Sequence, residues 1–375
     1  MEKRWRLVGI DFDHMHMGDL LRMAHAHPRI NIVGVADRDP ARAAKVAGPF
    51  DIGADQIWTD PVTCLRETGA DIAVLCPSTG RHADVVRQVA PWVRGVLVEK
   101  PFAANVADAD AMVRAVKDAG GTLAINWPLA WYPSHRTAKR LIDEGAIGAP
   151  LEVHYHDGNR GPLRHVADKV EIPEEEAAAL RADSWWYRKD AAGGSLQDYL
   201  GYGTTLGTWF LDGRTPVEVT CVVDERPGME VDEHAIVVAR YENPVALSKF
   251  ETRWGTFTDP WTHQPEPRCG FVIVGSRGTI ASPDYAPSIR VQTVDHPEGI
   301  DIEVDTFPLE QADPIAHFVH HLETGAPLHG PLRPDLCRIG QLVVDAAVRS
   351  ARAKRTVAVV ESGPESASGS LSPGV

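Results

Sequence analysis

The first third of the chain alternates short apolar runs with amphipathic stretches of helical period. Such alternation predicts strands that each lead into a helix. The predicted strands are residues 5–10, 30–36, 72–76, 95–98 and 122–126. Two of the helices between them open at side chains that favour helix starts, Asp39 before Pro40 and Asn105. This order is typical of a doubly wound parallel sheet, so we predict an α/β domain over residues 1–125.

After residue 150 the pattern changes to that of antiparallel strands with one buried face. Over 151–156, apolar residues alternate with Glu and His, which places the two kinds on opposite faces. Further strands are predicted at 217–223, 235–241, 246–254, 270–275 and 288–294, and an amphipathic helix at about 333–353. We predict a second, α+β domain over 126–360 with a large, mostly antiparallel open sheet. An acidic insertion at 171–182 is expected to form a helix over the cleft, and the composition of 361–375 predicts disorder.

Composition narrows the class of partner. The chain has 375 residues, 43% of them hydrophobic, and a formal net charge of −14. Nucleic acids and anionic membranes would repel such a protein, so we predict neither as a partner and favour a small neutral substrate. No apolar run approaches the ~20 residues of a membrane span. The five cysteines are scattered without a CxxC pair, which argues against disulfides and indicates a reducing cytoplasm: Cys64, Cys76, Cys221, Cys269 and Cys337.

The fourth of these apolar strands ends abruptly at Glu99-Lys100-Pro101. In open α/β sheets, ligands bind at the carboxyl ends of the strands. Pro101 fixes its own φ and restricts the backbone of Lys100, so this amine is held in place. A lysine that is partly desolvated can exchange a proton near neutral pH. We therefore predict that Lys100 is the centre of the chemistry.

The segment 193–202 supplies the other half of the predicted site. Asp198 and Tyr202 are four residues apart, so on a helix they project from one face. Gly193 and Gly194 before them allow the backbone to approach a ligand closely. With Lys100 they can form a proton relay for the oxidation of an alcohol. The alternative is structural, with Asp198 bonded at a helix end and Tyr202 packed in the core.

Asp37 ends the second strand, where dinucleotide-binding folds place the acid that binds the adenosine ribose. A carboxylate there repels a 2′-phosphate and favours NAD, while the neighbouring Arg38 leaves NADP possible. The first turn lacks the glycine fingerprint and instead reads Phe-Asp-His-Met-His-Met over 12–17. We hypothesise that His14 or His16 donates a hydrogen bond to the pyrophosphate.

Other candidate ligand contacts follow the strands at the same edge. Besides Lys100, Asp37 and Arg38, the residues predicted to bind the cofactor are Asp11, Phe12, His14, Met15, Pro77, Ser78, Thr79, His82, Glu99, Pro101 and Asn126. The residues predicted to contact substrate are Trp127, His154, His156 and Asn159, together with Lys100, Asp198 and Tyr202. For His82 the alternative is that it simply opens the following helix.

Several of these motifs, in their order and spacing, resemble one protein family. They are Val8-Gly9-Ile10, Ala36-Asp37, 77–82, 99–101, Gly148, Gly193-Gly194 with Asp198, 275–278 and the last helix. The chain resembles the glucose-fructose oxidoreductase, inositol dehydrogenase and rhizopine catabolism family, Gfo/Idh/MocA. The resemblance implies a Rossmann domain followed by a large open sheet, a nicotinamide dinucleotide, and oxidation or reduction of a sugar or cyclitol hydroxyl. Lys100 and Asp198 match the family's catalytic lysine and aspartate.

The same resemblance implies a homodimer or homotetramer that assembles through the open sheet. Two departures from the family pattern stand out: the glycine fingerprint is missing, and Tyr202 replaces the histidine of most members. A minority of relatives use the nucleotide for transient oxidation within a hydrolysis or elimination, which the sequence leaves open.

Two further classes remain open on the sequence. One is a sugar- or nucleotide-binding protein that keeps the fold without catalysis. The other is a metal-dependent hydrolase, because Asp11, His14 and His16 resemble the HxH metal motif of barrel hydrolases. The chain lacks the eight strand–helix units of such a barrel, so we predict no metal.

Overall fold

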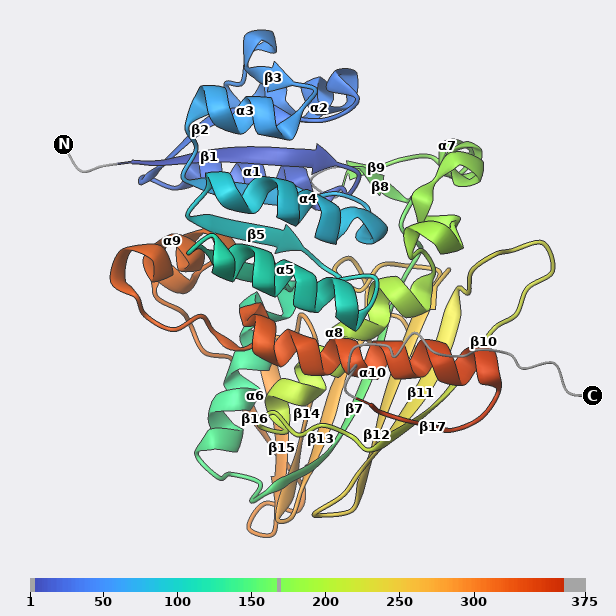
Figure 1. Cartoon of the computed structure of the whole chain (residues 1–375). Coiled ribbons are helices and arrows are strands. Elements are labelled where there is room, and N and C mark those ends of the chain that lie inside the picture. Colours follow the sequence, from blue (N-terminus) through green and yellow to red (C-terminus); the bar gives the residue numbers. More distant parts are fainter. Residues whose placement is uncertain (1–3, 167–169, 361–375) are drawn as a thin grey trace, which may run out of the picture.

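The computed structural model describes residues 4–166 and 170–360, which form two parts (Figure 1). The first part is a six-stranded sheet in the order β3-β2-β1-β4-β5-β6, and every neighbouring pair is parallel. Its strands are β1 (Trp5–Phe12), β2 (Ile30–Ala36), β3 (Ile57–Trp58), β4 (Ile72–Cys76), β5 (Gly95–Glu99) and β6 (Thr122–Asn126). The strand order reverses between β1 and β4, where doubly wound sheets bind ligands. The predicted Rossmann sheet is confirmed.

Local sequence explains this first part. Strands β4 and β5 are buried along their whole length, because helices cover both faces of a parallel sheet. The helices are α1 (His16–Ala26), α2 (Pro40–Ala47), α3 (Pro61–Thr68), α4 (His82–Val89) and α5 (Val106–Asp118). The predicted caps are in place: Asp39 accepts hydrogen bonds from the amides of Ala41 and Arg42, and Asn105 accepts one from Asp108.

The second part is a nine-stranded sheet in the order β16-β15-β14-β13-β7-β12-β11-β10-β17. Among the described strands of this second sheet, only the pair β7–β12 is parallel, so the predicted mostly antiparallel sheet is confirmed. The strands are β7 (Pro150–Asn159), β10 (Glu218–Val223), β11 (His234–Tyr241), β12 (Ala246–Trp254), β13 (Gly270–Gly275), β14 (Gly278–Pro283), β15 (Ser288–Thr293), β16 (Ile300–Glu303) and β17 (Val357–Ala358).

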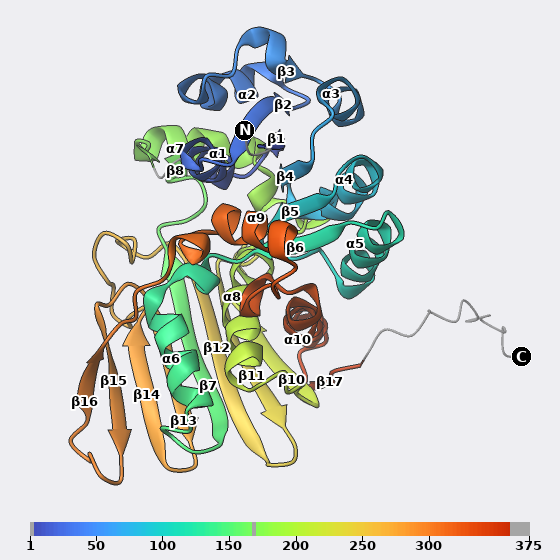
Figure 2. The same ribbon diagram turned by 90° about the vertical axis from the view of Figure 1, so that its left-hand side faces the viewer.

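Helices cover one face of this sheet and leave the other face open (Figure 2). The covering helices are α6 (Pro133–Asp143), α8 (Ser195–Phe210) and α10 (Pro334–Ala353). Helix α9 (Pro314–Thr324) was not predicted, and it packs on the first part, where Phe318 fills the space that a side chain at Gly95 would need. Strands β14, β16 and β17 were not predicted either, because they are short or polar.

Helix α8 is buried along almost its whole length, and its glycines explain how it fits. A Cβ atom at Gly201 would lie 2.4 Å from the indole of Trp127, and Cβ atoms at Gly203 and Gly207 would lie 2.9 Å from Phe250. Glycine therefore lets this helix lie close to its neighbours. The same packing fixes the directions of Asp198 and Tyr202, one turn apart.

The acidic insertion forms α7 (Glu174–Leu180), shorter than predicted, beside β8 (His165–Val166) and β9 (Val170–Glu171) near the carboxyl edge of the first sheet (Figure 1). The predicted disordered tail, 361–375, lies outside the described residues. Among the helices of residues 4–166 and 170–360, none combines the length and apolar character that crossing a bilayer requires.

Candidate active site

Lys100 and Asp198 meet in the interior, between the end of β5 and helix α8. The Lys100 Nζ atom donates to Asp198 Oδ1 at 2.6 Å, and each side chain is only 3% exposed. Ninety-eight residues of sequence separate the two, so only the fold brings them together. A buried ion pair is costly to desolvate, which makes this one a candidate for function rather than for stability alone.

Aromatic rings surround the Lys100 ammonium. Its Nζ atom lies 5.7 Å from the ring centre of Trp186, 5.4 Å from that of Tyr199 and 5.3 Å from that of Tyr202. At such distances aromatic faces attract a cation. The rings therefore help to hold the amine in a single position.

The pair opens onto a cavity of about 260 Å³. Its polar lining comes from both parts of the chain and includes His14, His16, Asn126, Asp157, Asp284 and Tyr285. A cavity with convergent polar groups is the usual form of a small-molecule site. Tyr202 lines it as predicted, while Trp127 lies behind Tyr202, with ring centres 5.0 Å apart.

Strand β7 supplies the opposite wall through one of its two faces. Asp157 and Asn159 point into the cavity, and Asn159 Nδ2 donates to the hydroxyl of Tyr199 at 2.5 Å. The predicted substrate contacts His154 and His156 do share a face, but they line a separate hollow of about 370 Å³ with Lys249. Strand alternation explains the correction, because residues of opposite parity lie on opposite faces.

Burial raises the pKa values of three acidic side chains that line the cavity. Desolvation raises the pKa of Asp198, although the charge of Lys100 opposes this, and desolvation holds the pKa of the Tyr202 phenol well above its usual range. The pKa of Asp157 also lies well above its usual value, because the group is buried and faces Asp284. Asp284 is held by His135 Nε2 at 2.7 Å and by the hydroxyl of Tyr155 at 3.0 Å.

Side chains replace glycine amides in the turn after β1. Asp11 has a left-handed backbone (φ 59°), and its carboxylate lies 3.0 Å from Arg81. Asp13 accepts from Arg42 at 2.6 Å and from the amide of Ser78 at 2.9 Å. Arg38 lies 3.5 Å from Asp13 and is largely exposed. Acids and arginines thus alternate over the edge where a pyrophosphate would lie.

The Asp37 carboxylate is fully engaged. Oδ1 accepts from the Asp39 amide and from Arg42 Nη2, and Oδ2 accepts from the Phe12 amide and from Arg42 Nε, all between 2.7 and 3.0 Å. A carboxylate has about four acceptor positions, so a ribose could bind only if Arg42 moved away.

Other predicted cofactor contacts are placed as follows. His82 lies buried, with each ring nitrogen 3.2 Å from a backbone carbonyl, those of Pro77 and Phe102, which matches its alternative structural role. Met15 precedes α1 and lines the cavity, and Pro101 is buried beside Lys100. Glu99 is fully buried and accepts from Asn126 Nδ2 at 2.6 Å.

Three buried polar atoms along this edge have no partner. They are His14 Nε2 and Thr79 Oγ1, in the turns after β1 and β4, and Asn126 Oδ1, at the last residue of β6. Buried polar groups are nearly always hydrogen-bonded, so a row of unpaired ones indicates a place for a polar ligand.

Gly193 and Gly194 serve the fold rather than a ligand. A Cβ atom at Gly193 would lie 2.2 Å from the Trp186 carbonyl oxygen, and Gly194 has φ 102°. The segment that they hold carries Trp185, whose Nε1 donates to the carbonyl of Asp13 at 3.2 Å. Residues of the second part thus cover the first turn of the Rossmann sheet.

Asp232 anchors the start of α8, because its carboxylate accepts from the amide of Leu196 at 2.8 Å. Burial raises its pKa to about 7, whereas an unfolded aspartate titrates near ~3.9. Between these values the folded chain keeps a proton that the unfolded chain releases. The free energy of unfolding should therefore fall as pH rises from about 4 to about 7, by at most ~1.4 kcal/mol per unit for this group.

Asp232→Asn should remove this component while keeping an acceptor for Leu196. Urea unfolding at several pH values measures the effect. The free energy of unfolding of the variant should rise relative to that of the wild type as pH increases. The same pH dependence in both proteins would contradict the assignment.

Comparison with known proteins identifies the family. Residues 3–127 match an oxidoreductase family profile described as an NAD-binding Rossmann fold, and residues 135–281 match the GFO/IDH/MocA C-terminal domain. The chain belongs to the GFO/IDH/MocA family of oxidoreductases. The predicted enzyme class is thereby confirmed, and the predicted cofactor agrees with the NAD-binding description of the family's first domain.

Individual proteins are similar to this chain over different shares of its length. Inositol 2-dehydrogenase of Rhizobium meliloti is 25% identical over 338 residues, 88% of this chain and 91% of that protein. D-apiose dehydrogenase of Rhizobium rhizogenes is 29% identical over 120 residues, 32% of this chain and 34% of that protein. An inositol dehydrogenase homologue from Azotobacter vinelandii, solved with NAD+, shares the fold, with a TM-score of 0.78 and 15% identity over 96% of this chain and 98% of that one.

The residues present fit a nicotinamide dinucleotide at one end of the edge. The three unpaired polar atoms lie around the end of the GFO/IDH/MocA sheet that carries Lys100, and this is where hydrogen-bonding groups are still available. At the adenosine end, Asp37 stands at the predicted position with its acceptor sites taken by Arg42. A ribose could bind Asp37 only if Arg42 gave up these hydrogen bonds.

The sequence did not lead us to Asp157, Asp284 and Tyr199, whereas Trp186 belongs to a group of aromatic residues that their positions beside the catalytic segments predict near the cleft. Asp157 could have been predicted from the sequence, because strand alternation places it and Asn159 two residues apart and Asn159 was already a predicted substrate contact. Tyr199 follows Asp198 directly, but a helix turns neighbouring residues by about 100°, so adjacency did not suggest a shared cavity. Asp284 lies just after β14, outside the regular elements, and no pattern in the sequence points to it.

Proposed function

We propose that this protein oxidises a secondary hydroxyl of a sugar, glycoside or cyclitol, with NAD as the hydride acceptor. The observation that carries the proposal is the buried Lys100–Asp198 pair at the edge of a GFO/IDH/MocA Rossmann sheet, open to a polar cavity. The relatives named inositol 2-dehydrogenase and D-apiose dehydrogenase support a polyhydroxylated substrate. The acids Asp157 and Asp284 in the wall disfavour substrates that carry a phosphate or carboxylate.

In this mechanism Lys100 binds the carbinol oxygen through Nζ and stabilises the charge that develops as the hydroxyl proton leaves. Asp198 holds the amine at 2.6 Å and shares its proton, and the Tyr202 phenol stays protonated and donates to the same oxygen. Lys100, Asp198 and Tyr202 together form the relay. The cofactor, when bound, supplies the hydride acceptor beside the carbinol carbon.

On the cofactor side, His14, Thr79 and Asn126 have buried polar atoms available for the dinucleotide. We favour NAD over NADP, because the acids Asp37 and Asp13 lie at the adenosine end and oppose a further phosphate. The positive charges of Arg38, Arg42 and Arg81 are matched by the carboxylates of Asp11, Asp13 and Asp37. None of these three cations is therefore left unpaired for a 2′-phosphate.

The test is a rate assay with NAD or NADP and a panel of polyols that includes myo-inositol, scyllo-inositol and D-apiose, followed at 340 nm. Reduction with one or more polyols and a preference for NAD are expected. Cofactor binding without turnover on any polyol would favour the non-catalytic binding protein. Release of product without net reduced cofactor would favour transient oxidation within an elimination or hydrolysis.

The open face of the nine-stranded sheet supports assembly with a second copy of the chain. Exposed apolar residues on this face are Val222, Ile236, Val238, Leu247 and Val272. Apolar residues gathered on one face of a sheet favour burial against a partner. We expect a dimer or tetramer by sedimentation, converted to smaller species by Val238→Lys. A monomeric wild type would refute this part of the proposal.

The five cysteines are buried and unpaired, which supports a reducing compartment such as the cytoplasm as the place where the protein works.

A further inference from the structure

The proposed reaction releases a proton among side chains that are almost completely buried. Lys100 and Asp198 are each 3% exposed, and Tyr202 is 7% exposed. Lys100 as an ammonium has no lone pair, and the raised pKa of Tyr202 keeps the phenol protonated. The Asp198 carboxylate can accept a proton, but it is almost fully buried, so the relay needs a further group that passes the proton to solvent.

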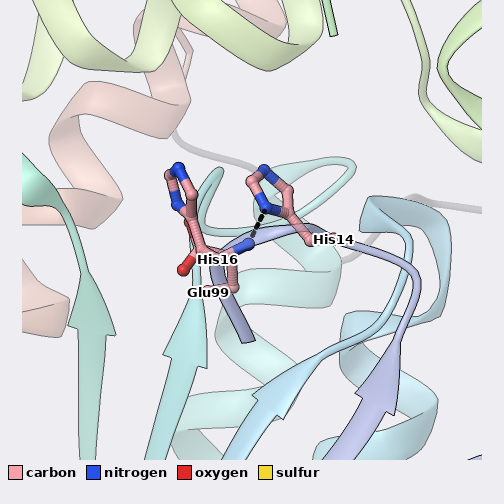
Figure 3. A group of neighbouring side chains, drawn as sticks. All are labelled: His14, His16 and Glu99. Atoms are coloured by element: carbon pink, nitrogen blue, oxygen red, sulfur yellow. Dashed lines mark hydrogen bonds and ion pairs between the residues drawn. The ribbon is translucent and has the colours of Figure 1, made fainter. Parts of the chain in front are cut away.

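His16, the first residue of α1, lies on the wall of the same cavity with 20% of its side chain exposed. Its Nδ1 atom lies 2.8 Å from Oε1 of Glu99, which is fully buried (Figure 3). A carboxylate only accepts hydrogen bonds, so Nδ1 carries a proton, and in the neutral ring Nε2 then has the lone pair that accepts one. Glu99 is held in turn by Asn126 at 2.6 Å. This is the arrangement of a histidine base oriented by an acid.

His14 has the opposite tautomer. Its Nδ1 atom accepts a hydrogen bond from the backbone amide of His16 at 3.2 Å, so the proton of the ring lies on Nε2 (Figure 3). Desolvation and the charges of His16 and Lys100 hold the pKa of His14 well below its usual value, so this ring stays neutral. The two ring centres are 4.3 Å apart. One ring donates and the other accepts, which complements a hydroxyl group or a water.

The same three side chains could be read as a metal site, because ligand atoms of His14, His16 and Glu99 lie within 4.8 Å of one another. Their hydrogen bonds argue against it. A ligating histidine normally donates its other ring N–H, whereas His14 Nδ1 accepts one. His16 and Glu99 are bonded directly to each other.

We propose that His16, oriented by Glu99, is the terminal proton acceptor of the site and transfers the proton to solvent. The inference rests on the proposed function. As the carbinol carbon is oxidised to a carbonyl, the hydride passes to the nicotinamide cofactor and the hydroxyl proton moves through the Lys100–Asp198 pair to His16 Nε2. The resulting imidazolium is stabilised by Glu99 and then loses its proton to water, so atoms and charge balance.

Charged groups around His16 come from several elements. The titratable groups that face it are His14, Glu99, Lys100 and Asp198, and Asp19 and Arg22 line the same cavity from its own helix. Removing the Glu99 charge should therefore shift the midpoint of the acid limb of kcat/KM toward lower pH, since the imidazolium loses its nearest counter-charge.

His16→Gln should lower kcat at least 100-fold, with KM changed less than threefold, and added imidazole should restore part of the rate. Glu99→Gln should move the midpoint of the acid limb of the kcat/KM profile to lower pH by about one unit. The exposed His25 on the same helix provides the matched control, and His25→Gln should leave the rate and the limb unchanged. Circular dichroism checks that each variant is folded.

A second readout needs no turnover. Nitrogen-15 NMR of the imidazoles should report a proton on Nδ1 of His16 in the wild type and a mixture of tautomers in Glu99→Gln. The opposite tautomer, a kcat loss below threefold in His16→Gln, or a stoichiometric divalent metal lost in that variant would each overturn the inference. If the protein were inactive on every polyol but His16 still carried its proton on Nδ1, the proposed reaction would be refuted. The orientation of His16 by Glu99 would still be supported.

Discussion

Replacing Lys100 with alanine should lower kcat by roughly 100- to 10,000-fold, because the amine is the group placed to bind the carbinol oxygen. NAD affinity should stay within about threefold of wild type, since Lys100 is bonded to Asp198 and the dinucleotide has other contacts along the edge. Initial rates at 340 nm and a fluorescence titration with NAD measure the two quantities.

Lys100→Met is the matched variant, because it keeps the volume of the side chain and removes only the charge. Both variants should lose activity to a similar degree. If Lys100→Met retained near wild-type kcat, the amine would have no chemical role. Another side chain would then have to bind the carbinol oxygen.

Asp198→Leu should lower the free energy of unfolding by about 3–5 kcal/mol, because it leaves the Lys100 ammonium buried without a counter-charge. The surrounding rings of Trp186, Tyr199 and Tyr202 cannot replace a carboxylate. Urea unfolding at neutral pH measures the loss.

The double variant Lys100→Met with Asp198→Leu should recover most of that stability, since an apolar pair of similar volume often replaces a buried ion pair without loss. It should remain inactive. A double variant as unstable as Asp198→Leu would mean that the loss comes from packing around α8 and not from the unpaired charge.

Much of the fold was predictable from the sequence, because it depends on periodicity. Five of the six parallel strands follow apolar runs, whereas β3 has only two residues and was not predicted, and α2 and α5 begin at the side chains that cap them. The relay of Lys100 with Asp198 was predicted from residue types and their expected elements and was supported by the family resemblance, but no local pattern gives the contact itself, because the two residues lie 98 positions apart.

The parts that escaped prediction depend on tertiary contacts. The alternation along β7 correctly grouped His154 with His156, but only the packing of α8 against the other face decided that Asp157 and Asn159 line the cavity. The engagement of Asp37 by Arg42 could not be foreseen either, because it depends on the turn of α2.

The indole of Trp127, one residue beyond β6, occupies the notch that Gly201 leaves in α8, and its edge supports Tyr202. If the two parts of the chain moved apart here, the Trp127 indole would lose its packing against Gly201. We therefore expect the two parts to keep their relative positions. Cofactor and substrate should then enter and leave through rotamer changes of individual side chains, such as Arg42.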